Sequence, residues 1–275
     1  MDKSATTPVI TVIGTCRVHH PLRALEEKGL ISLNNGGMGS FVHTTSEALL
    51  RLKVLLGTMA YSPDIVKLQV GESKDVRLCA DDDFDFSKSD ILVVEVSTIK
   101  AVSVDGSPLQ FNEVNRHLCT PFGEFGKALR ENLNFAFNTR QQFVSAPDIE
   151  PPEDFPAEFL EIIHKIQPIV MDSRLIASDL DEIRKLANIP LLLVNHINIP
   201  GEDGELISSR NKLCTIMNEY AKSEGLGIFN PSSMFETHLP EVLLMQGGKD
   251  LNHYAKNMLD IVGDIQLQSI MKLLE

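Results

Sequence analysis

The stretch Pro8-Val-Ile-Thr-Val-Ile-Gly-Thr-Cys-Arg17 decides the fold of this chain. It begins with a short run of β-branched apolar residues, which is typical of a buried strand. The run ends at Gly14, and residues 17–28 then have the pattern of a helix closed by Gly29. A buried strand followed at once by a helix is the repeating unit of a parallel sheet. The turn between them would present Cys16 at the carboxyl edge of that sheet.

Pro21 interrupts the helical pattern of residues 17–28. Proline has no backbone N–H to donate, so it fits best at the first position of a helix. We therefore expect the regular helix to begin near residue 20.

Other short apolar runs predict the remaining strands, at 31–33, 91–96, 189–194 and 227–229. Helical patterns lie between them at 47–55 (capped by Thr44 or Thr45), 174–187 and 206–223, and a last helix is expected from about 253 to 274. Buried strands that alternate with helices indicate a parallel sheet covered on both faces. The predicted fold class is α/β: a three-layer α/β/α sandwich with a doubly wound, five-stranded parallel sheet.

Residues 101–170 separate the third and fourth expected strands and are too many for a simple crossover. Helical patterns at 123–135 and 157–166 flank a loop rich in proline and acidic residues, 146–156. We expect a single domain over residues 1–275, with about 101–170 inserted as a helical cap. Such an insertion would either cover a substrate pocket or decorate the surface.

The chain of 275 residues carries a formal net charge of −13 and has no block rich in lysine or arginine. Nucleic acids and anionic membrane surfaces bind clustered positive charge, so we expect neither as a partner. The N-terminus lacks the pattern of a signal peptide, and no apolar run approaches the roughly 20 residues that span a bilayer. The four cysteines are widely spaced, which favours free thiols. We expect a soluble, cytoplasmic protein.

Cys16 is the first candidate for a catalytic residue. In a turn between a strand and a helix, its thiol would lie near unpaired backbone N–H groups and the positive end of a helix dipole. Both favour the thiolate, and Arg17 adds a neighbouring cation. The alternative is that Cys16 is a small packing residue, because cysteine is among the residues most often buried.

A second motif, Asp250-Leu-Asn-His253, lies far along the chain in a polar loop. In a doubly wound sheet, a loop after the last strand can reach the turn after the first. A nucleophile needs a base within hydrogen-bond reach and a third group that orients the base. Cys16, His253 and Asp250 supply those three roles. The alternative is that Asp250 caps the last helix and His253 is a solvated residue of its first turn.

These two motifs resemble those of the SGNH/GDSL hydrolase superfamily. Its members have a Gly-Asp-Ser nucleophile turn after the first strand, an Asp-x-x-His near the C-terminus and a flavodoxin-like sandwich. Gly14-Thr15-Cys16 stands at the first motif, and Asp250-Leu-Asn-His253 matches the last. The chain is more similar still to divergent branches with a Gly-x-Cys motif, the GSCFA proteins and capsule-biosynthesis acyltransferase-like proteins. The resemblance implies Cys16 as nucleophile, His253 as base and Asp250 as its orienting group.

The chain departs from that superfamily where the oxyanion is held. SGNH enzymes use a Gly in a second motif and an Asn in a third. Here Asn-Asn-Gly36-Gly37 stands near the second motif, so Gly36 or Gly37 is expected to supply a backbone donor. The third strand is followed by Val-Ser97-Thr, without an Asn. We expect Ser97, or Asn195 after the fourth strand, to replace the missing donor, and Arg17 to lie near the substrate.

Other candidates have less support. His19 and His20 are close to the nucleophile in sequence, but residues one or two apart on a helix point in different directions. Glu95, at the end of a buried strand, would be either an active-site carboxylate or the ion-pair partner of Arg17 or Arg51. The sequence contains no recognised metal-ligand spacing, so we expect no metal.

The expected function is acyl transfer, or ester or thioester hydrolysis, through a thioester on Cys16. Water as acceptor would make the protein a hydrolase, and a sugar, amine or peptide group would make it a transferase. We expect no cofactor, a small-molecule acyl substrate, and an acyl donor bound to coenzyme A or to an acyl carrier. Two alternatives stay open: a non-catalytic protein that binds a ligand in the same fold, and an acyltransferase that tailors a polysaccharide or natural product.

Overall fold

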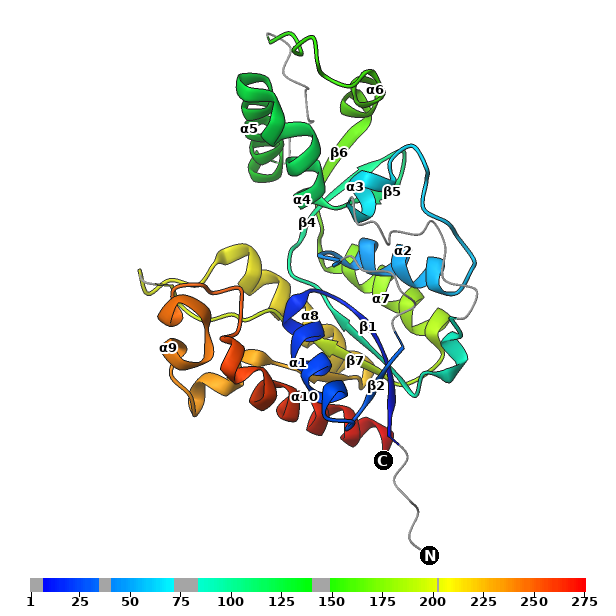
Figure 1. The fold of residues 1–275 in the computed structure, drawn as a ribbon, viewed down its shortest axis with the longest axis vertical. Helices are drawn as coiled ribbons and strands as arrows, with labels where there is room; N and C mark the ends of the chain where they lie inside the picture. The colour runs from blue at the N-terminus through cyan, green and yellow to red at the C-terminus, as the bar shows by residue number, and fades with distance from the viewer. Residues whose placement is uncertain (1–6, 35–40, 72–83, 140–148, 202) are drawn as a thin grey trace, which may run out of the picture.

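A computed structural model gives the fold of the chain, and it describes residues 7–34, 41–71, 84–139, 149–201 and 203–275 (Figure 1). Its central element is a sheet of five parallel strands in the order β2-β1-β3-β7-β8. These strands are β1 (Val9–Ile13), β2 (Ser32–Leu33), β3 (Ile91–Glu95), β7 (Leu191–Val194) and β8 (Gly227–Phe229). This is the flavodoxin-like strand order. The predicted five-stranded parallel sheet is confirmed.

Helices cover both faces of the sheet, as the prediction of a three-layer sandwich requires. Successive side chains of a strand point to opposite faces, so each strand contributes to two cores. One core includes Leu92 and Val94 of β3, and the other includes Ile91 and Val93. The first face is covered by α2 (Thr45–Leu55), α7 (Ser173–Ala187) and α8 (Ser208–Glu224), and the second by α1 (Cys16–Glu27) and α10 (Leu259–Leu274).

Helix α1 begins at Cys16 and not near residue 20, so that prediction was wrong. Thr15 is the N-cap, and its side chain accepts a hydrogen bond from the backbone N–H of Arg17. Pro21 therefore lies inside the helix, where it cannot donate to the carbonyl of Arg17. That carbonyl instead accepts a hydrogen bond from Nε2 of Gln266 on α10, at 3.4 Å. A partner helix thus satisfies the group that the proline leaves open.

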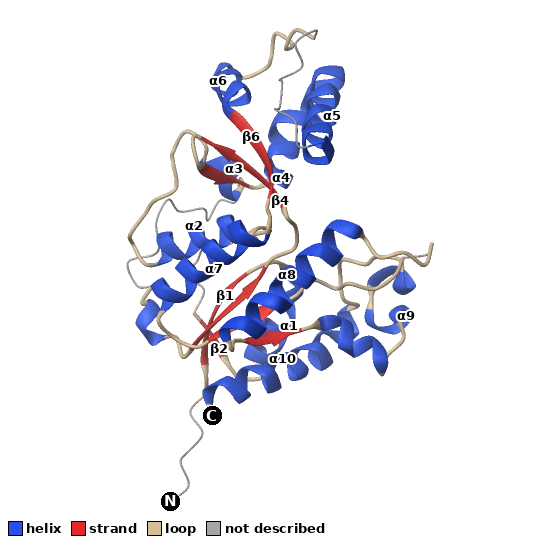
Figure 2. Cartoon of the chain, turned by 180° about the vertical axis from the view of Figure 1, so that it is seen from behind, coloured by secondary structure: helices blue, strands red, loops and turns tan. Residues whose placement is uncertain are grey.

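The inserted unit (residues 100–170) follows β3 and leads back to α7. The expected helices are present as α5 (Gly123–Thr139) and α6 (Ala157–Lys165), but the unit is not wholly helical. It also contains an antiparallel sheet in the order β5-β4-β6 and a core of its own. Figures 1 and 2 show it at the end of the molecule opposite the C-terminus. Its strands are β4 (Lys100–Val104), β5 (Ser107–Leu109) and β6 (Ile166–Val170), and its short helix is α4 (Phe111–Val114).

Shorter elements complete the chain. Helix α3 (Val66–Val70) packs against α4 and β5, and α9 (Pro240–Leu243) precedes the last loops. Short 3₁₀ segments are Phe86–Lys88, Thr120–Phe122, Pro231–Glu236, Met245–Gly248 and Lys256–Met258, and a π-helical turn is Asn115–Cys119. Helix α10 begins later than expected, which leaves His253 in the loop before it. Within the described ranges, no helix combines the length and the apolar character that crossing a bilayer requires.

Candidate active site

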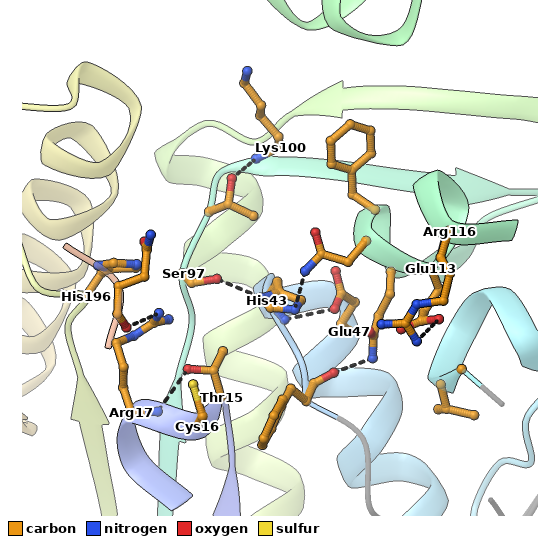
Figure 3. A pocket seen from close by; sticks show the side chains of 18 of the residues that line it. Thr15, Cys16, Arg17, His43, Glu47, Ser97, Lys100, Glu113, Arg116 and His196 are labelled. Atoms are coloured by element: carbon orange, nitrogen blue, oxygen red, sulfur yellow. Dashed lines mark hydrogen bonds and ion pairs between the residues drawn. The ribbon is translucent and has the colours of Figure 1, made fainter. Parts of the chain in front are cut away.

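A cavity of about 930 Å³ lies between the carboxyl edge of the parallel sheet and the inserted unit. Its walls come from both parts of the fold, and Figure 3 shows most of the side chains that line it. The sandwich contributes, among others, Thr15, Cys16, Arg17, His43, Ser97, His196, Arg210 and His253. The inserted unit contributes Lys100, Gln110, Phe111, Asn112, Glu113 and Arg116.

Cys16 is the first residue of α1 and opens onto this cavity. Its thiol is free and half-buried. Burial raises the pKa of the thiol above its ordinary value, and Glu95 raises it further, whereas Arg17 and the backbone N–H groups lower it. We had expected Arg17 and the helix terminus to favour the thiolate. The structure differs mainly because burial of the thiol disfavours the thiolate, and also because the charge of Arg17 is matched by a carboxylate.

That carboxylate is Glu95, which is fully buried at the end of β3. Its Oε1 accepts hydrogen bonds from Arg17 Nε at 3.0 Å and Nη2 at 2.5 Å. Its Oε2 accepts hydrogen bonds from the backbone N–H and the hydroxyl of Thr15, at 2.7 and 2.5 Å. Glu95 is therefore the ion-pair partner of Arg17, which was one of the alternatives that the sequence left open for this residue. It ties the end of β3 to both neighbours of Cys16.

Gly14 is required for this close approach of β1 and β3. A Cβ atom at position 14 would lie 2.7 Å from Cγ1 of Val18 and 2.9 Å from Cβ of Glu95. Atoms do not approach so closely without displacement, so only glycine lets the turn pass over Glu95. The glycine of the Gly14-Thr15-Cys16 motif thus has a packing role as well as a place in the turn.

Asp250 and His253 form a hydrogen bond of 2.8 Å between Oδ2 and Nδ1. The other carboxylate oxygen of Asp250 accepts from the backbone N–H of Asn252, at 2.9 Å. Burial raises the pKa of Asp250, but the hydrogen bonds from Asn252 and His253 outweigh it and lower that pKa overall. An ionised carboxylate only accepts, so Nδ1 of His253 carries the hydrogen and Nε2 is free to take a proton when the ring is neutral.

His253 lines the same cavity as Cys16 and is about half exposed. Across the part of the chain that the structure describes, no hydrogen bond joins the Cys16 thiol to the His253 imidazole. The structure therefore brings Cys16 and His253 to one cavity, with the imidazole of His253 oriented by the carboxylate of Asp250. Direct transfer of a proton from the thiol to the imidazole would require a movement of the exposed ring or a bridging water.

Two arginines hold the loop that carries His253. Arg17 donates from Nη1 to the backbone oxygen of Asn252, at 3.4 Å. Arg210, in the first turn of α8, donates to the backbone oxygen of Leu251 at 3.2 Å and to Oδ1 of Asn252 at 2.8 Å. Burial and the nearby Arg17 lower the pKa of Arg210 to about 10, so it stays charged near neutral pH. Sequence analysis did not identify Arg210.

The expected oxyanion donors have different outcomes. Gly36 and Gly37 lie outside the described residues. Ser97 lines the cavity. Asn195 does not line the cavity as described, and its Nδ2 donates to Oδ1 of Asn218 at 2.9 Å. That Ser97 or Asn195 donates to the oxyanion stays a prediction, and of these two residues only Ser97 lines the cavity.

Two histidines on the cavity wall were missed by sequence analysis. His43 lies between Ser97 and Asn112, with its Nδ1 2.9 Å from Ser97 Oγ and its Nε2 3.2 Å from Asn112 Nδ2. Burial is the main cause that lowers the pKa of His43. His196 follows β7 and donates from Nδ1 to the backbone oxygen of Ile197 at 2.8 Å; burial lowers its pKa to about 2. Its place directly after a buried strand was a signal that could have identified it.

The remaining candidates do not form a site of their own. The ring of His19 packs against the ring of Phe41 with centroids 5.7 Å apart, and burial lowers the pKa of His19 to about 4. The ring of His20 also lies near Phe41, at 6.4 Å. Among the described residues, no group of three or more His, Cys, Asp or Glu side chains is arranged to hold a metal ion.

Comparison with known proteins finds a matching family model and a similar curated protein. A family model described as the TviD N-terminal domain matches residues 8–269. The Vi polysaccharide biosynthesis protein TviD of Salmonella typhi is 25% identical over 277 residues, which cover 98% of this chain and 32% of that protein. The chain thus spans about a third of the length of this relative.

Solved structures of the lipase type are also similar to this chain. A lipase/acylhydrolase from Enterococcus faecalis has a TM-score of 0.41 at 10% identity, covering 97% of this chain and 96% of that one. A GDSL-like lipase from Bacteroides thetaiotaomicron has a TM-score of 0.41 at 10% identity, covering 96% of this chain and 88% of that one.

Proposed function

Because this chain belongs to the TviD N-terminal domain family, we propose that it transfers or hydrolyses an acyl group through a thioester on Cys16. The observation that carries the proposal is that Cys16 and His253 line one cavity, with His253 hydrogen-bonded to Asp250. Cys16 supplies the nucleophile, His253 the general base and Asp250 the group that fixes the tautomer of His253.

In the first half of the reaction, Nε2 of His253 takes the thiol proton as the sulfur of Cys16 bonds to the acyl carbon. The oxygen of the tetrahedral intermediate accepts hydrogen bonds from the backbone N–H of Cys16 and from the Ser97 hydroxyl. That N–H belongs to the first turn of α1, where amides have no partner within the helix. The bond to the leaving oxygen or sulfur then breaks, and the leaving group takes the proton from His253.

In the second half, an acceptor hydroxyl gives its proton to His253 as its oxygen attacks the thioester carbonyl. The carbon–sulfur bond breaks, and the departing sulfur of Cys16 recovers the proton. Water as acceptor completes a hydrolysis, and a sugar hydroxyl completes a transfer. No cofactor is needed for either half, because every proton and electron pair moves between substrate, Cys16 and His253.

The raised pKa of Cys16 makes the neutral thiol the resting form, so the proton must be removed during attack. General-base catalysis of this kind contributes about 10²–10⁴-fold to a rate. The reaction therefore depends on His253 more strongly than it would with a preformed thiolate.

For the acceptor, we propose a saccharide hydroxyl. The relative from Salmonella typhi is named a Vi polysaccharide biosynthesis protein, which favours the tailoring of a polysaccharide. The cavity volume of about 930 Å³ lies near the upper end of ligand pockets, which span roughly 300–1,000 Å³. That volume accommodates an acyl group and one end of a sugar chain together. A donor bound to coenzyme A or to an acyl carrier is consistent with the cytoplasmic location that we propose.

Intact-mass spectrometry after incubation with activated esters and acyl thioesters tests the chemistry. We expect the native protein to gain the mass of one acyl group, and Cys16→Ala to gain none. Cys214→Ser is the matched control, because Cys214 is buried within α8 and outside the cavity, so its replacement should leave the adduct unchanged. In His253→Ala we expect slow formation and slower release of the adduct, whereas His238→Ala, outside the cavity, should behave as the native protein.

The same experiment separates the enzyme from a non-catalytic binding protein. If Cys16 gains no acyl group and reacts with alkylating reagents like an ordinary thiol at every pH, catalysis through a thioester is excluded. Retained binding of saccharide under those conditions, measured by calorimetry, would then favour a ligand-binding role for the cavity.

A further inference from the structure

We infer that His43 and Asn112 are positioning residues that direct the hydroxyl hydrogen of Ser97 into the cavity. This inference rests on the proposed function, in which Ser97 is one of the donors to the oxyanion. It adds two residues of the cavity wall, one of them from the inserted unit, to the catalytic apparatus.

The three side chains form a continuous chain of hydrogen bonds. Nδ2 of Asn112 lies 3.2 Å from Nε2 of His43, and Nδ1 of His43 lies 2.9 Å from Oγ of Ser97. All three residues line the cavity. Figure 3 shows Ser97 and His43 joined in this way below Lys100.

The direction of each hydrogen follows from the chemistry of these groups. An amide nitrogen can only donate, so Nε2 of His43 must accept from Asn112. Burial lowers the pKa of His43, which keeps its ring neutral near pH 7. A neutral imidazole carries one hydrogen, and it must then be on Nδ1. Nδ1 therefore donates to Ser97, whose own hydrogen points elsewhere, into the cavity that it lines.

The backbone holds His43 in register with Ser97. The carbonyl oxygen of His43 accepts hydrogen bonds from the backbone N–H groups of Ser97, at 2.8 Å, and Thr98, at 3.0 Å. Its own N–H donates to Oε2 of Glu47, at 2.8 Å. Because these contacts fix the main chain on both sides, the ring has little freedom to release Ser97.

The inserted unit supplies the other end of the chain. Asn112 belongs to α4, and the preceding Gln110 donates from its side chain to the backbone oxygen of Phe41, two residues before His43. The backbone N–H of Gln110 donates to the carbonyl oxygen of Leu68, at 2.8 Å. Asn112 is thus anchored against the segment that carries His43. A contact from the inserted unit thereby determines how a residue after β3 presents its hydrogen.

The substitution Asn112→Asp tests the direction of the hydrogens with almost no change of shape. A carboxylate only accepts, so it requires a hydrogen on Nε2 of His43. The neutral ring of His43 then has an unprotonated Nδ1. This nitrogen accepts a hydrogen bond from the Ser97 hydroxyl, whose hydrogen no longer points into the cavity. Asn138→Asp is the matched control, since Asn138 is exposed on α5 and outside the cavity.

Long-range ¹H–¹⁵N NMR spectra at about pH 9, well above the ordinary pKa of histidine, report which ring nitrogen is protonated. We expect Nδ1–H for His43 in the native protein and in Asn138→Asp, and Nε2–H in Asn112→Asp. A native ring protonated at Nε2 would overturn the inference. This measurement needs no substrate, so its outcome is independent of whether Cys16 forms a thioester.

The rate of Cys16 acylation gives the second measurement. Loss of one oxyanion donor costs about 10²–10³-fold in rate, which is the effect we expect for Ser97→Ala. Asn112→Asp should cost a large part of the same factor, and the double variant should be no slower than Ser97→Ala alone. Effects that multiply in the double variant would show that Asn112 acts by another route and would overturn the inference. Failure of the native protein to acylate at all would instead contradict the proposed function.

Discussion

The cavity has a glutamate–arginine pair on each side, and the two pairs differ sharply in their exposure to water. On the side of the parallel sheet, Arg17 and Glu95 are 2.5 Å apart, with side-chain exposures of 7% and 0%. On the side of the inserted unit, Arg116 and Glu113 are 3.0 Å apart, and Arg116 is 65% exposed. Figure 3 shows the two arginines at opposite sides of the cavity.

This difference in exposure indicates that the two sides of the cavity have different roles. The buried pair connects three segments, because Glu95 also binds Thr15 and Arg17 also reaches the loop of His253. It therefore couples the position of Cys16 to that of His253. The second pair joins residues of neighbouring segments in the inserted unit, and although its glutamate is buried, most of its arginine side chain is exposed to water and can adjust to a ligand. The sheet side provides fixed geometry, and the inserted side provides an adjustable surface.

Replacing each arginine with methionine should separate the two sides most clearly. Arg17→Met leaves the buried carboxylate of Glu95 without its cation, which we expect to lower the free energy of unfolding by about 3–5 kcal/mol. Arg116→Met removes a largely exposed charge, and the buried Glu113 keeps its contact with Nε2 of His117 at 3.4 Å, so we expect a loss of less than about 1 kcal/mol. Urea denaturation measures both values. Equal losses for the two variants would refute the distinction between a fixed side and an adjustable one.

Gly126 allows a test of whether the inserted unit unfolds separately from the sheet. A Cβ atom at this position would lie 1.7 Å from the carbonyl oxygen of Cys119, so Gly126→Ala forces α5 away from the preceding turn. We expect a loss of about 1–3 kcal/mol, as for other overpacked sites. Hydrogen exchange should accelerate in α5 and in β4 to β6, and stay slow in β1, β3 and β7.

Alanine at position 128, already present in the native sequence, shows that α5 tolerates a methyl group elsewhere. Ala128→Gly therefore serves as the control for a change of helix propensity without overpacking. It should cost about 1 kcal/mol, because glycine is the poorer helix former. If Gly126→Ala accelerates exchange equally in both sheets, the two parts unfold as one cooperative unit.

The parallel sheet could be predicted from the sequence because each of its strands is a short, nearly continuous apolar run. The turn at Cys16 and the pair Asp250–His253 were also accessible, since each consists of neighbours in sequence. The ion pair between Arg17 and Glu95 was only one of the alternatives that the sequence left open for Glu95. The sequence places Glu95 at a strand end but does not reveal which arginine reaches it across 78 residues.

What the sequence did not reveal depends on contacts between distant segments. The start of α1 was misplaced because a glutamine on α10 satisfies the carbonyl that Pro21 leaves open. His43 and Asn112 meet only when the inserted unit folds over the sheet, 69 residues apart. One missed feature did have a local signal. Asp105 and Gly106 both have positive φ and join β4 to β5, and Asp-Gly between short apolar runs predicts such a hairpin.

The smallest effect that we expect is on the pH dependence of the free energy of unfolding. It is tested by replacing one buried and one exposed histidine. Burial, with Arg17 and Arg210 nearby, lowers the pKa of His196 from 6.5 to about 2. As the pH falls below 6.5, His196 therefore binds a proton in the unfolded chain but stays neutral in the folded protein. The free energy of unfolding then decreases. His196→Asn keeps a donor for the carbonyl oxygen of Ile197 but removes the titrating ring. We expect the native protein to lose about 1 kcal/mol more than this variant between pH 7.5 and 5.5.

The matched control is His164→Asn, because His164 is exposed on α6 of the inserted unit. Urea denaturation at a series of pH values, for the native protein and both variants, separates the effect of the buried ring from the loss of an exposed one. Two half-buried histidines, His19 and His43, would still contribute to the acid sensitivity of the His196→Asn variant, since burial lowers their pKa values too. The decisive quantity is therefore the difference between the two slopes. Parallel slopes for the native protein and His196→Asn would mean that water reaches His196, and that the sheet side of the cavity is less dry than its buried ion pair implies.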